Sequence, residues 1–229
     1  DEKILSQMLD SGMNVARINF SHGTHEEHQA KIDLLKKVRE AKKKPLAIML
    51  DTKGPEFRIG CFAEGKCILN SGDEFTFTVD DVVGNNQKVT VSYKNLHREL
   101  EAGNQILVNN GLLVFTVKEI KGKDIICNVD VGGEISDRKS MSFPNKVLKQ
   151  PYLSEQDKAD MLFGIKNDVD FIACSFVSSK QDLVDVINFL NQHGGNNIGL
   201  IAKIENRAGV DNIEEICSVC DGIMIGRGD

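Results

Sequence analysis

The chain has 229 residues, of which 41% are hydrophobic and 27% are charged. With a mean hydropathy of −0.23, this composition is typical of a globular protein that has a sizeable core and forms one large domain or two smaller ones. The formal net charge of −6 argues against nucleic acid or an anionic membrane as a partner. The apolar runs have the length of strands and are too short to span a membrane.

Six cysteines are scattered along the chain, and Cys217 and Cys220 have the spacing of a CxxC motif. A single CxxC without a second pair does not favour a metal or redox site. The first residues, Asp-Glu-Lys, do not resemble a signal peptide. We therefore expect a cytoplasmic protein with reduced cysteines.

The first 50 residues alternate between helical and strand patterns. A helical stripe of apolar residues, without an evident cap, runs from residue 2 to Gly12, and a strand pattern covers residues 13–20. Thr24 is a candidate cap for a helix over residues 26–44, which Pro45 ends, and residues 46–50 form another apolar strand. This alternation with short connections predicts a parallel α/β sheet.

Residues 61–149 follow a different pattern, with short β-rich runs and no convincing helical stripe. The runs cover residues 74–79, 88–93, 105–120, with a break at 109–111, and 124–129, and turn residues separate them. They predict an all-β module inserted into an α/β domain. We therefore expect residues 1–60 and 150–229 to form one barrel domain, interrupted by a lid of residues 61–149.

The α/β pattern resumes after Pro151. Ser154 is a candidate cap for a helix that runs to about Lys166, a strand covers residues 170–174, and a helix covers residues 179–192. Two further apolar runs, 198–202 and 222–226, predict buried parallel strands. The segment 207–219 between them is long enough for one crossover helix.

Charged residues follow the last two predicted strands: Lys203 and Glu205 after the first, Arg227 and Asp229 after the second. Because the carboxyl ends of neighbouring parallel strands meet at one edge of a sheet, we expect Glu205 and Asp229 to converge with Lys203 nearby. Two carboxylates and an ammonium suit a hard divalent cation that holds phosphate oxygens. The alternative is that these charges only mark where solvent begins.

Polar residues also follow the other predicted strands, for example Asn19, Asp51 and Ser175. In a (β/α) barrel several strands contribute to the site, whereas an open doubly wound sheet concentrates it at one switch point. Neither GxGxxG nor GxxxxGK[ST] is present. We therefore predict an α/β fold, a partial (β/α)8 TIM barrel with about five of its eight strands, interrupted by a barrel-like all-β lid.

Four segments resemble the pyruvate kinase family. They are residues 14–23 (NVARINFSHG), 50–58 (LDTKGPEFR), 203–206 (KIEN) and 221–229 (DGIMIGRGD). The resemblance runs from end to end of the chain and implies the family's barrel, with residues of about 61–149 as its lid. It also implies transfer of a phosphoryl group from phosphoenolpyruvate to ADP, giving pyruvate and ATP in glycolysis, by a protein that is a homotetramer at full length.

The resemblance implies roles for individual residues as well. Lys203 would be catalytic, stabilising the phosphoryl group in transfer. The substrate would be bound by Arg17, Lys203, Gly228 and Asp229. Magnesium would be bound by Glu205 and Asp229, and potassium by Asn19, Ser21, Asp51 and the carbonyl of Thr52. The nucleotide side would comprise Asn19, Phe20, Ser21, His22, Arg58 and Lys139.

Glu56 bears on the cation requirement. Family members with Glu at this position typically need potassium, and members with Lys do not, so we predict potassium dependence. His22, His25 and His28 could suggest a metal site, but on a helix they would fan around the axis. Hard oxygen ligands suit magnesium and potassium, and solvated or capping histidines are therefore favoured.

The chain departs from the family pattern in two places and omits part of it. Val108-Asn-Asn-Gly111 stands where the lid usually has Val-Asp-Asp-Gly, and residues 142–145 read SFPN where the hinge usually reads NLPG. Strands of the barrel, a threonine that assists enolate protonation and the C-terminal domain are not found, so we expect a fragment that is inactive alone. Two alternatives remain: a phosphoenolpyruvate/pyruvate-type carbon–carbon lyase, and a catalytically dead barrel that serves as a scaffold.

Overall fold

The computed structural model describes residues 1–144, 146 and 148–226, and they divide into two compact units. Among the described residues, the first unit comprises residues 1–55 and 151–226, and the second lies within residues 56–150. The contacts thus divide the chain at 55/56 and 150/151. The expected domain boundaries, at 60/61 and 149/150, remain a prediction.

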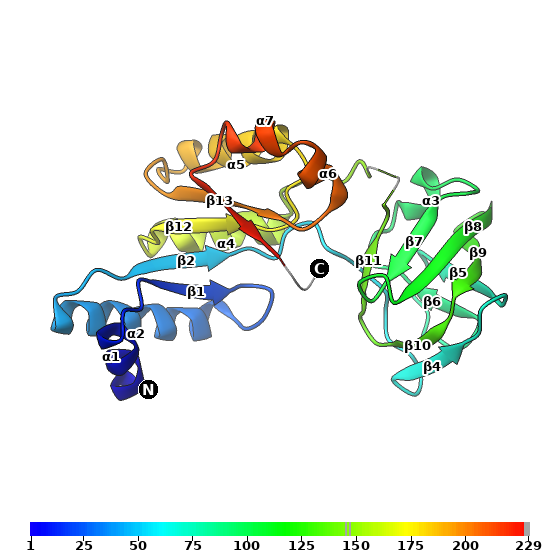
Figure 1. Cartoon of the computed structure of the whole chain (residues 1–229), viewed down its shortest axis with the longest axis horizontal. Coiled ribbons are helices and arrows are strands. Elements are labelled where there is room, and N and C mark those ends of the chain that lie inside the picture. Colours follow the sequence, from blue (N-terminus) through cyan, green and yellow to red (C-terminus); the bar gives the residue numbers. More distant parts are fainter. Residues whose placement is uncertain (145, 147, 227–229) are drawn as a thin grey trace. The chain divides into compact units, whose positions relative to one another are not determined.

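The first unit is built on a parallel sheet, whose described strands pair in the order β1 (Val15–Asn19), β2 (Ala47–Asp51), β12 (Phe171–Cys174), β13 (Gly199–Ile204) and β14 (Gly222–Ile225) (Figure 1). Within this unit each strand pairs with the one that precedes it in the chain. A doubly wound sheet reverses its direction at a switch point, whereas this order continues in one direction, as in a (β/α) barrel. The strand order confirms the prediction of a partial α/β barrel.

Capped helices connect these strands. The described helices of the first unit are α1 (Glu2–Asp10), α2 (His25–Lys42), α4 (Glu155–Lys166), α5 (Lys180–Gln192), α6 (Arg207–Asp211) and α7 (Ile213–Cys217). Thr24, Ser154 and Ser179 each form a capping box with the acidic residue three positions later. The first helix also has a cap, since the Asp1 carboxylate accepts from the Lys3 amide, and the expectation of an uncapped start is wrong.

The segment 207–219, predicted as one crossover helix, forms the two short helices α6 and α7. Asn212 ends the first helix and begins the second, with φ −102° and ψ 16°. Its side-chain amide donates to the Ser178 carbonyl at 2.8 Å. Asparagine competes with helical hydrogen bonding in this way, which explains why the helix is divided at this residue.

Side-chain alternation along the strands separates the core from a polar face. On β13, Leu200, Ala202 and Ile204 are buried in the cluster that contains helix residues such as Leu183. Lys203, between two of them, points to the opposite side, because successive strand residues face opposite ways. The polar residues of the strand ends therefore lie on the face of the sheet that does not pack against the helices.

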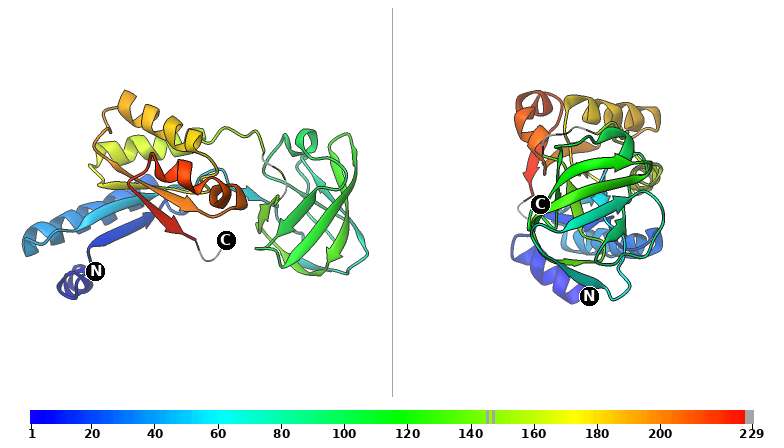
Figure 2. Two further views of the ribbon diagram at one scale, coloured as in Figure 1. Left: turned by 45° about the horizontal axis from the view of Figure 1, so that its top comes forward. Right: turned by 90° about the vertical axis from the view of Figure 1, so that its right-hand side faces the viewer.

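The second unit is a closed β barrel (Figure 2). Its described strands pair in the order β3 (Phe57–Arg58), β11 (Ser140–Ser142), β7 (Gln105–Val108), β8 (Leu113–Lys121), β9 (Asp124–Val131), β5 (Glu74–Thr78) and β6 (Lys88–Thr90), and β10 (Gly133–Ser136) pairs with β4 (Lys66–Leu69). A bridge between Ile59 and Val91 joins the first strand of this order to the last. Phe75, Phe77 and Phe115 fill the centre and are fully buried.

Two local features of the second unit depart from expectation. A one-turn helix, α3 (Leu96–Glu99), interrupts the all-β pattern. Asn109 and Asn110, which replace the two aspartates usual in the family, have φ values of 55° and 56° in the turn between β7 and β8. Asparagine tolerates this left-handed conformation better than most residues, so both positions suit the turn.

Within the described ranges, no helix combines the length and apolarity that crossing a membrane requires.

Candidate active site

Five polar side chains from neighbouring strands meet at the carboxyl edge of the parallel sheet. We call Arg17, Asp51, Ser175, Lys203 and Glu205 the strand-tip cluster. The strand register explains the meeting, since Asp51 pairs with Ala173 on β12, and Cys174 pairs with Ala202 on β13. The next residues along these two strands are Ser175 and Lys203, which bond to each other at 2.8 Å.

Lys203 lies at the centre of the cluster. Its ammonium Nζ is 3.0 Å from Asp51 Oδ1 and 3.0 Å from Glu205 Oε1. Both carboxylates are almost fully buried, and the lysine side chain is 12% exposed. Burial disfavours the ammonium, but the charges of Asp51 and Glu205 outweigh it and raise the pKa of Lys203. The lysine is therefore a fixed positive charge at neutral pH.

Asp51 joins two cationic side chains. Its Oδ1 faces Lys203, and its Oδ2 accepts from Arg17 Nη1 at 2.8 Å. The Arg17 side chain is 52% exposed, so its guanidinium can turn toward a ligand in solvent. The two carboxylates and two cations of the cluster, Asp51, Glu205, Arg17 and Lys203, sum to zero formal charge. An anionic substrate is therefore not attracted by these four residues alone.

The Glu205 carboxylate is also held by the backbone of the neighbouring strand end. Its Oε2 accepts from the Phe176 amide at 2.9 Å. Phe176 has φ 55°, a left-handed conformation that is uncommon for an aromatic residue. Such conformations persist where the surrounding structure fixes them, often at functional sites. Gly228 and Asp229, the remaining predicted partners, lie outside the described residues, so the expected convergence of Glu205 with Asp229 stays a prediction.

The residues predicted to hold potassium lie at the ends of β1 and β2. Asn19 pairs with Asp51 in the strand register, and the Phe20 amide donates to the Asp51 carbonyl at 2.9 Å. The Asn19 side-chain oxygen accepts from the Ser21 amide at 2.9 Å. Amide, hydroxyl, carboxylate and carbonyl oxygens are hard ligands. This donor set therefore fits a hard cation.

The loop after β2 packs closely against the strand-tip cluster. Gly54 has φ 68°, and its amide donates to the buried Asp157 carboxylate at 3.0 Å. A Cβ built on Gly54 would lie 2.7 Å from the Ser175 carbonyl oxygen. The same carbonyl accepts from the Tyr152 hydroxyl at 2.7 Å, and burial raises the pKa of Tyr152 well above its usual value. Glycine at position 54 therefore lets the loop approach the Ser175 backbone.

We expect Gly54→Ala to destabilise the protein more than Gly194→Ala. Gly194 has φ 82° and open space where a Cβ would be, so its replacement costs only the left-handed strain, about 1–2 kcal/mol. At Gly54 the contact with backbone adds about 1–3 kcal/mol. Thermal unfolding midpoints measure the difference, and equal midpoints for the two variants would show that the close approach has no energetic weight.

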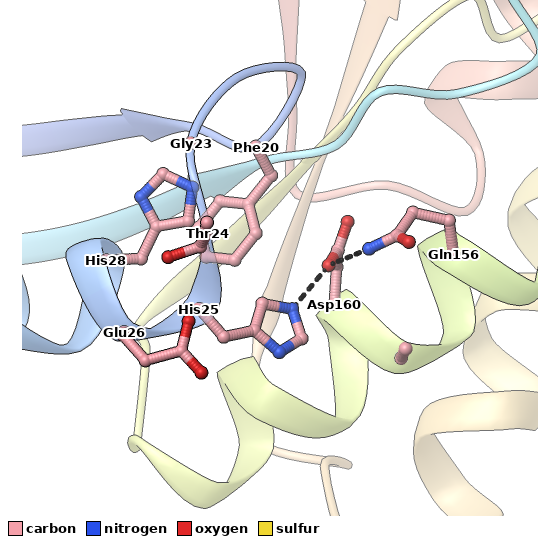
Figure 3. A pocket seen from close by; sticks show the side chains of 9 residues that line it. Phe20, Gly23, Thr24, His25, Glu26, His28, Gln156 and Asp160 are labelled. Carbon is pink, nitrogen blue, oxygen red and sulfur yellow. Dashed lines mark hydrogen bonds and ion pairs between the residues drawn. The ribbon is translucent and has the colours of Figure 1, made fainter.

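His25 lines a shallow hollow of about 340 Å³ between the start of α2 and α4 (Figure 3). Its Nε2 lies 2.6 Å from Oδ1 of the buried Asp160, and Gln156 donates to the same oxygen at 2.8 Å. The His25 ring also stacks on Phe163, with 4.5 Å between ring centroids. These contacts tie the start of α2, and the loop that precedes it, to α4.

His28 lines the same hollow and packs into the core. Its side chain stacks on Phe20 with 4.1 Å between ring centroids, and the residue is 1% exposed. The interpretation of these histidines as solvated or capping is therefore wrong for His28, because an aromatic partner buries its ring. Burial lowers the pKa of His28, and the charge of Lys31 adds to the effect.

The lowered pKa of His28 predicts a loss of stability in weak acid. In the unfolded chain the imidazole takes a proton below about pH 6.5, whereas in the fold it stays neutral to lower pH. Stability is therefore complete above the unfolded pKa and falls as the pH decreases below it, by at most about 1.4 kcal/mol per pH unit. We expect His28→Gln to reduce the change in the unfolding midpoint between pH 7 and pH 5. A midpoint that varies with pH as much as in the wild type would contradict this role of His28.

Two predicted nucleotide-side residues lie together in the second unit. Arg58 is in β3 opposite Ser140 of β11, and the Ile59 amide donates to the carbonyl of Lys139. Arg58 also forms an ion pair with Glu56. Of the other nucleotide-side residues, His22 is exposed, while the Phe20 side chain lies in the core. For Phe20 only the backbone is left to contact a ligand.

Comparison with known proteins supplies the deciding observation. The family model described as "Pyruvate kinase, barrel domain" matches residues 1–229. The chain belongs to the pyruvate kinase family. It is 47% identical to a pyruvate kinase of Clostridium perfringens and 43% identical to one of Clostridium acetobutylicum, in each case over the whole chain and 48% of the relative.

The fold of this chain also matches that of a solved structure from the pyruvate kinase family. A crystal structure of a pyruvate kinase from Cryptosporidium parvum superposes with a TM-score of 0.91 at 36% identity, covering the whole chain and 48% of that protein. A pyruvate kinase of Staphylococcus haemolyticus is 42% identical, with 39% of its length covered. The chain thus spans about half the length of the curated relatives it matches, or less.

The structure adds Ser175, Tyr152 and Phe176 to the candidate site, three residues that the sequence pattern does not single out as site residues. In the sequence Ser175 is marked only by its place at the end of a predicted strand, and nothing in the pattern marks Tyr152 or Phe176. A signal for Ser175 was available, because β12 lies between β2 and β13 in the predicted barrel order. The residue that follows β12 must therefore stand between Asp51 and Lys203.

Proposed function

We propose that the full-length protein containing this chain transfers a phosphoryl group from phosphoenolpyruvate to ADP, giving pyruvate and ATP. The supporting observation is the Lys203 ammonium, which two buried carboxylates hold at the carboxyl edge of the sheet. A phosphoryl transfer needs positioning and positive charge around the moving group more than covalent chemistry. Lys203 supplies that charge at a fixed place, and Arg17 supplies a second cation that can turn toward a phosphate.

We propose that the cofactors are magnesium, held by Glu205 and Asp229, and potassium, held by Asn19, Ser21, Asp51 and the Thr52 carbonyl. Bound there, the ions would neutralise charge on the phosphate oxygens. The electrostatics support the proposal, since the four charged residues of the strand-tip cluster sum to zero formal charge. An enzyme for a highly anionic substrate needs further positive charge at such a site.

The remaining roles follow from the same proposal. We assign substrate binding to Arg17, Lys203, Gly228 and Asp229. We assign nucleotide binding to Asn19, the backbone of Phe20, Ser21, His22, Arg58 and Lys139. We further propose a cytoplasmic, glycolytic homotetramer at full length, with neither nucleic acid nor membrane as a partner. The closed β barrel of the second unit is the element that the carbon–carbon lyase alternative lacks.

A coupled assay of pyruvate formation by the full-length protein tests the function. We expect turnover with phosphoenolpyruvate, ADP and magnesium in potassium buffer, and much lower turnover in sodium buffer. Glu56, the residue behind the potassium prediction, is largely buried and paired with Arg58. Equal turnover in both buffers would contradict the potassium requirement, and release of pyruvate without nucleotide would favour a lyase.

A further inference from the structure

We propose that Ser175 is a positioning residue that keeps the Lys203 ammonium in place when cations occupy the carboxylates around it. The inference rests on the proposed function and adds to it a residue that links Lys203 to the Thr52 carbonyl, one of the proposed potassium ligands. Ser175 Oγ lies 2.8 Å from Lys203 Nζ and 2.6 Å from the Thr52 carbonyl oxygen.

The direction of these two hydrogen bonds is fixed by chemistry. An ammonium can only donate, and a carbonyl oxygen can only accept. The Ser175 hydroxyl therefore donates its hydrogen to Thr52 and turns a lone pair toward Lys203. The Asp51 carboxylate is a more distant acceptor, at 3.3 Å from Ser175 Oγ, and does not change this direction.

The backbone of Ser175 is held on both sides. Its amide donates to Thr52 Oγ1 at 3.1 Å, and its carbonyl accepts from the Tyr152 hydroxyl at 2.7 Å. Only 2% of the residue is exposed, and Gly54 approaches it closely. A serine held in this way can fix the position of a lysine that is otherwise attached through a flexible four-carbon chain.

Ser175 differs from the other partners of Lys203 in carrying no charge. Among the described residues, the three hydrogens of the ammonium are directed at Asp51, Glu205 and Ser175. Asp51 and Glu205 are proposed cation ligands, and a bound cation would share these carboxylates with the lysine and repel it. The neutral Ser175 is not subject to that competition. It is therefore the partner that retains Lys203 in the cation-loaded enzyme.

The test compares Ser175→Ala with Ser178→Ala in the full-length protein. Ser178 is a partly buried neighbour whose hydroxyl bonds to Phe176 and Asn206 and not to the lysine. We expect Ser175→Ala to lower kcat by about tenfold to a hundredfold, as for loss of a hydrogen bond to a charged group, and Ser178→Ala to leave it nearly unchanged. If Ser175→Ala does not fold, Ser175→Cys, with its weakly bonding thiol, replaces it.

A second readout does not depend on turnover. Lys203 is acetylated with acetic anhydride, and the extent of labelling is measured by mass spectrometry relative to that of Lys158. The reaction is run once in magnesium and potassium chlorides and once in tetramethylammonium chloride of equal ionic strength. We expect Ser175→Ala to accelerate labelling by about tenfold with the cations and to have little effect without them, when the carboxylates still hold the lysine.

The outcomes separate the two proposals. An unchanged kcat in Ser175→Ala, or an acceleration of labelling that is the same with and without cations, would overturn the role of Ser175. A wild-type protein that does not turn over phosphoenolpyruvate and ADP would overturn the proposed function. The labelling comparison would then still decide whether Ser175 holds Lys203 against bound cations.

Discussion

Replacing Lys203 by methionine is expected to lower kcat of the full-length protein by about 10²–10³-fold, the range for loss of one preorganised stabilising group. The ammonium is the most buried cation of the strand-tip cluster, with 12% of its side chain exposed. Methionine has a similar shape but supplies no charge to the phosphoryl group. The effect should fall on kcat, with little change in the KM for ADP, because the lost interaction strengthens in the transition state.

Two controls accompany this variant. Lys158→Met removes a lysine of α4 that pairs with an exposed glutamate, Glu155, and should keep wild-type turnover. Lys203→Met also leaves two buried carboxylates without their shared partner, so circular dichroism must show that it folds. Lys203→Arg preserves the charge but not the compact ammonium, and it too should lose turnover. Normal kcat in a folded Lys203→Met protein would exclude this lysine from the chemistry.

Replacing Asp51 by asparagine is expected to affect both stability and the potassium requirement. The carboxylate is 2% exposed and contacts Lys203 and Arg17. Breaking a buried ion pair costs about 3–5 kcal/mol, and because Arg17 is half exposed we expect about 3 kcal/mol. For a protein of 150–250 residues this corresponds to a decrease of about 6–12 °C in the unfolding midpoint. The concentration of potassium for half-maximal activity should rise about tenfold or more, because the proposed site loses its negative charge.

Asp168→Asn provides the matched comparison. Asp168 is 90% exposed and lies 3.9 Å from Lys36, so a change there should leave the free energy of unfolding within about 0.5 kcal/mol of the wild type. If Asp51→Asn lowers stability but leaves the potassium requirement unchanged, Asp51 has a structural role only. Such a result would remove the residue from the proposed cation site.

The strand-tip cluster could be predicted from the sequence to the extent that strand ends define it. Lys203 and Asp51 follow apolar runs whose period is clear, and parallel pairing brings their ends together. Arg17 was implied only by the resemblance to the family. The pairing of Phe176 with Glu205 could not be predicted, because a positive φ at an aromatic residue has no local signature. The burial of His28 depended on the position of Phe20, which lies eight residues earlier, on the far side of a turn.

Whether an element boundary could be predicted also depended on whether its cause is local or distant in the sequence. The caps Thr24 and Ser154 were predictable, since a cap and its partner are only three residues apart. The break at Asn212 depends on a bond to Ser178, and the short strands β3 and β11 depend on each other across residues far apart in sequence. Such contacts exist only once the fold has formed, so the sequence pattern does not contain them.

The pairing of β3 with β11 has a consequence for how such a protein could arise. Residues 57 and 58 begin the second unit, and their strand partners, residues 140 and 141, stand near its end. A module whose entry and exit strands are adjacent can be inserted by a single event, because the host strands β2 and β12 remain neighbours in their sheet. A change in the core of one unit therefore need not disturb the strand pairing of the other.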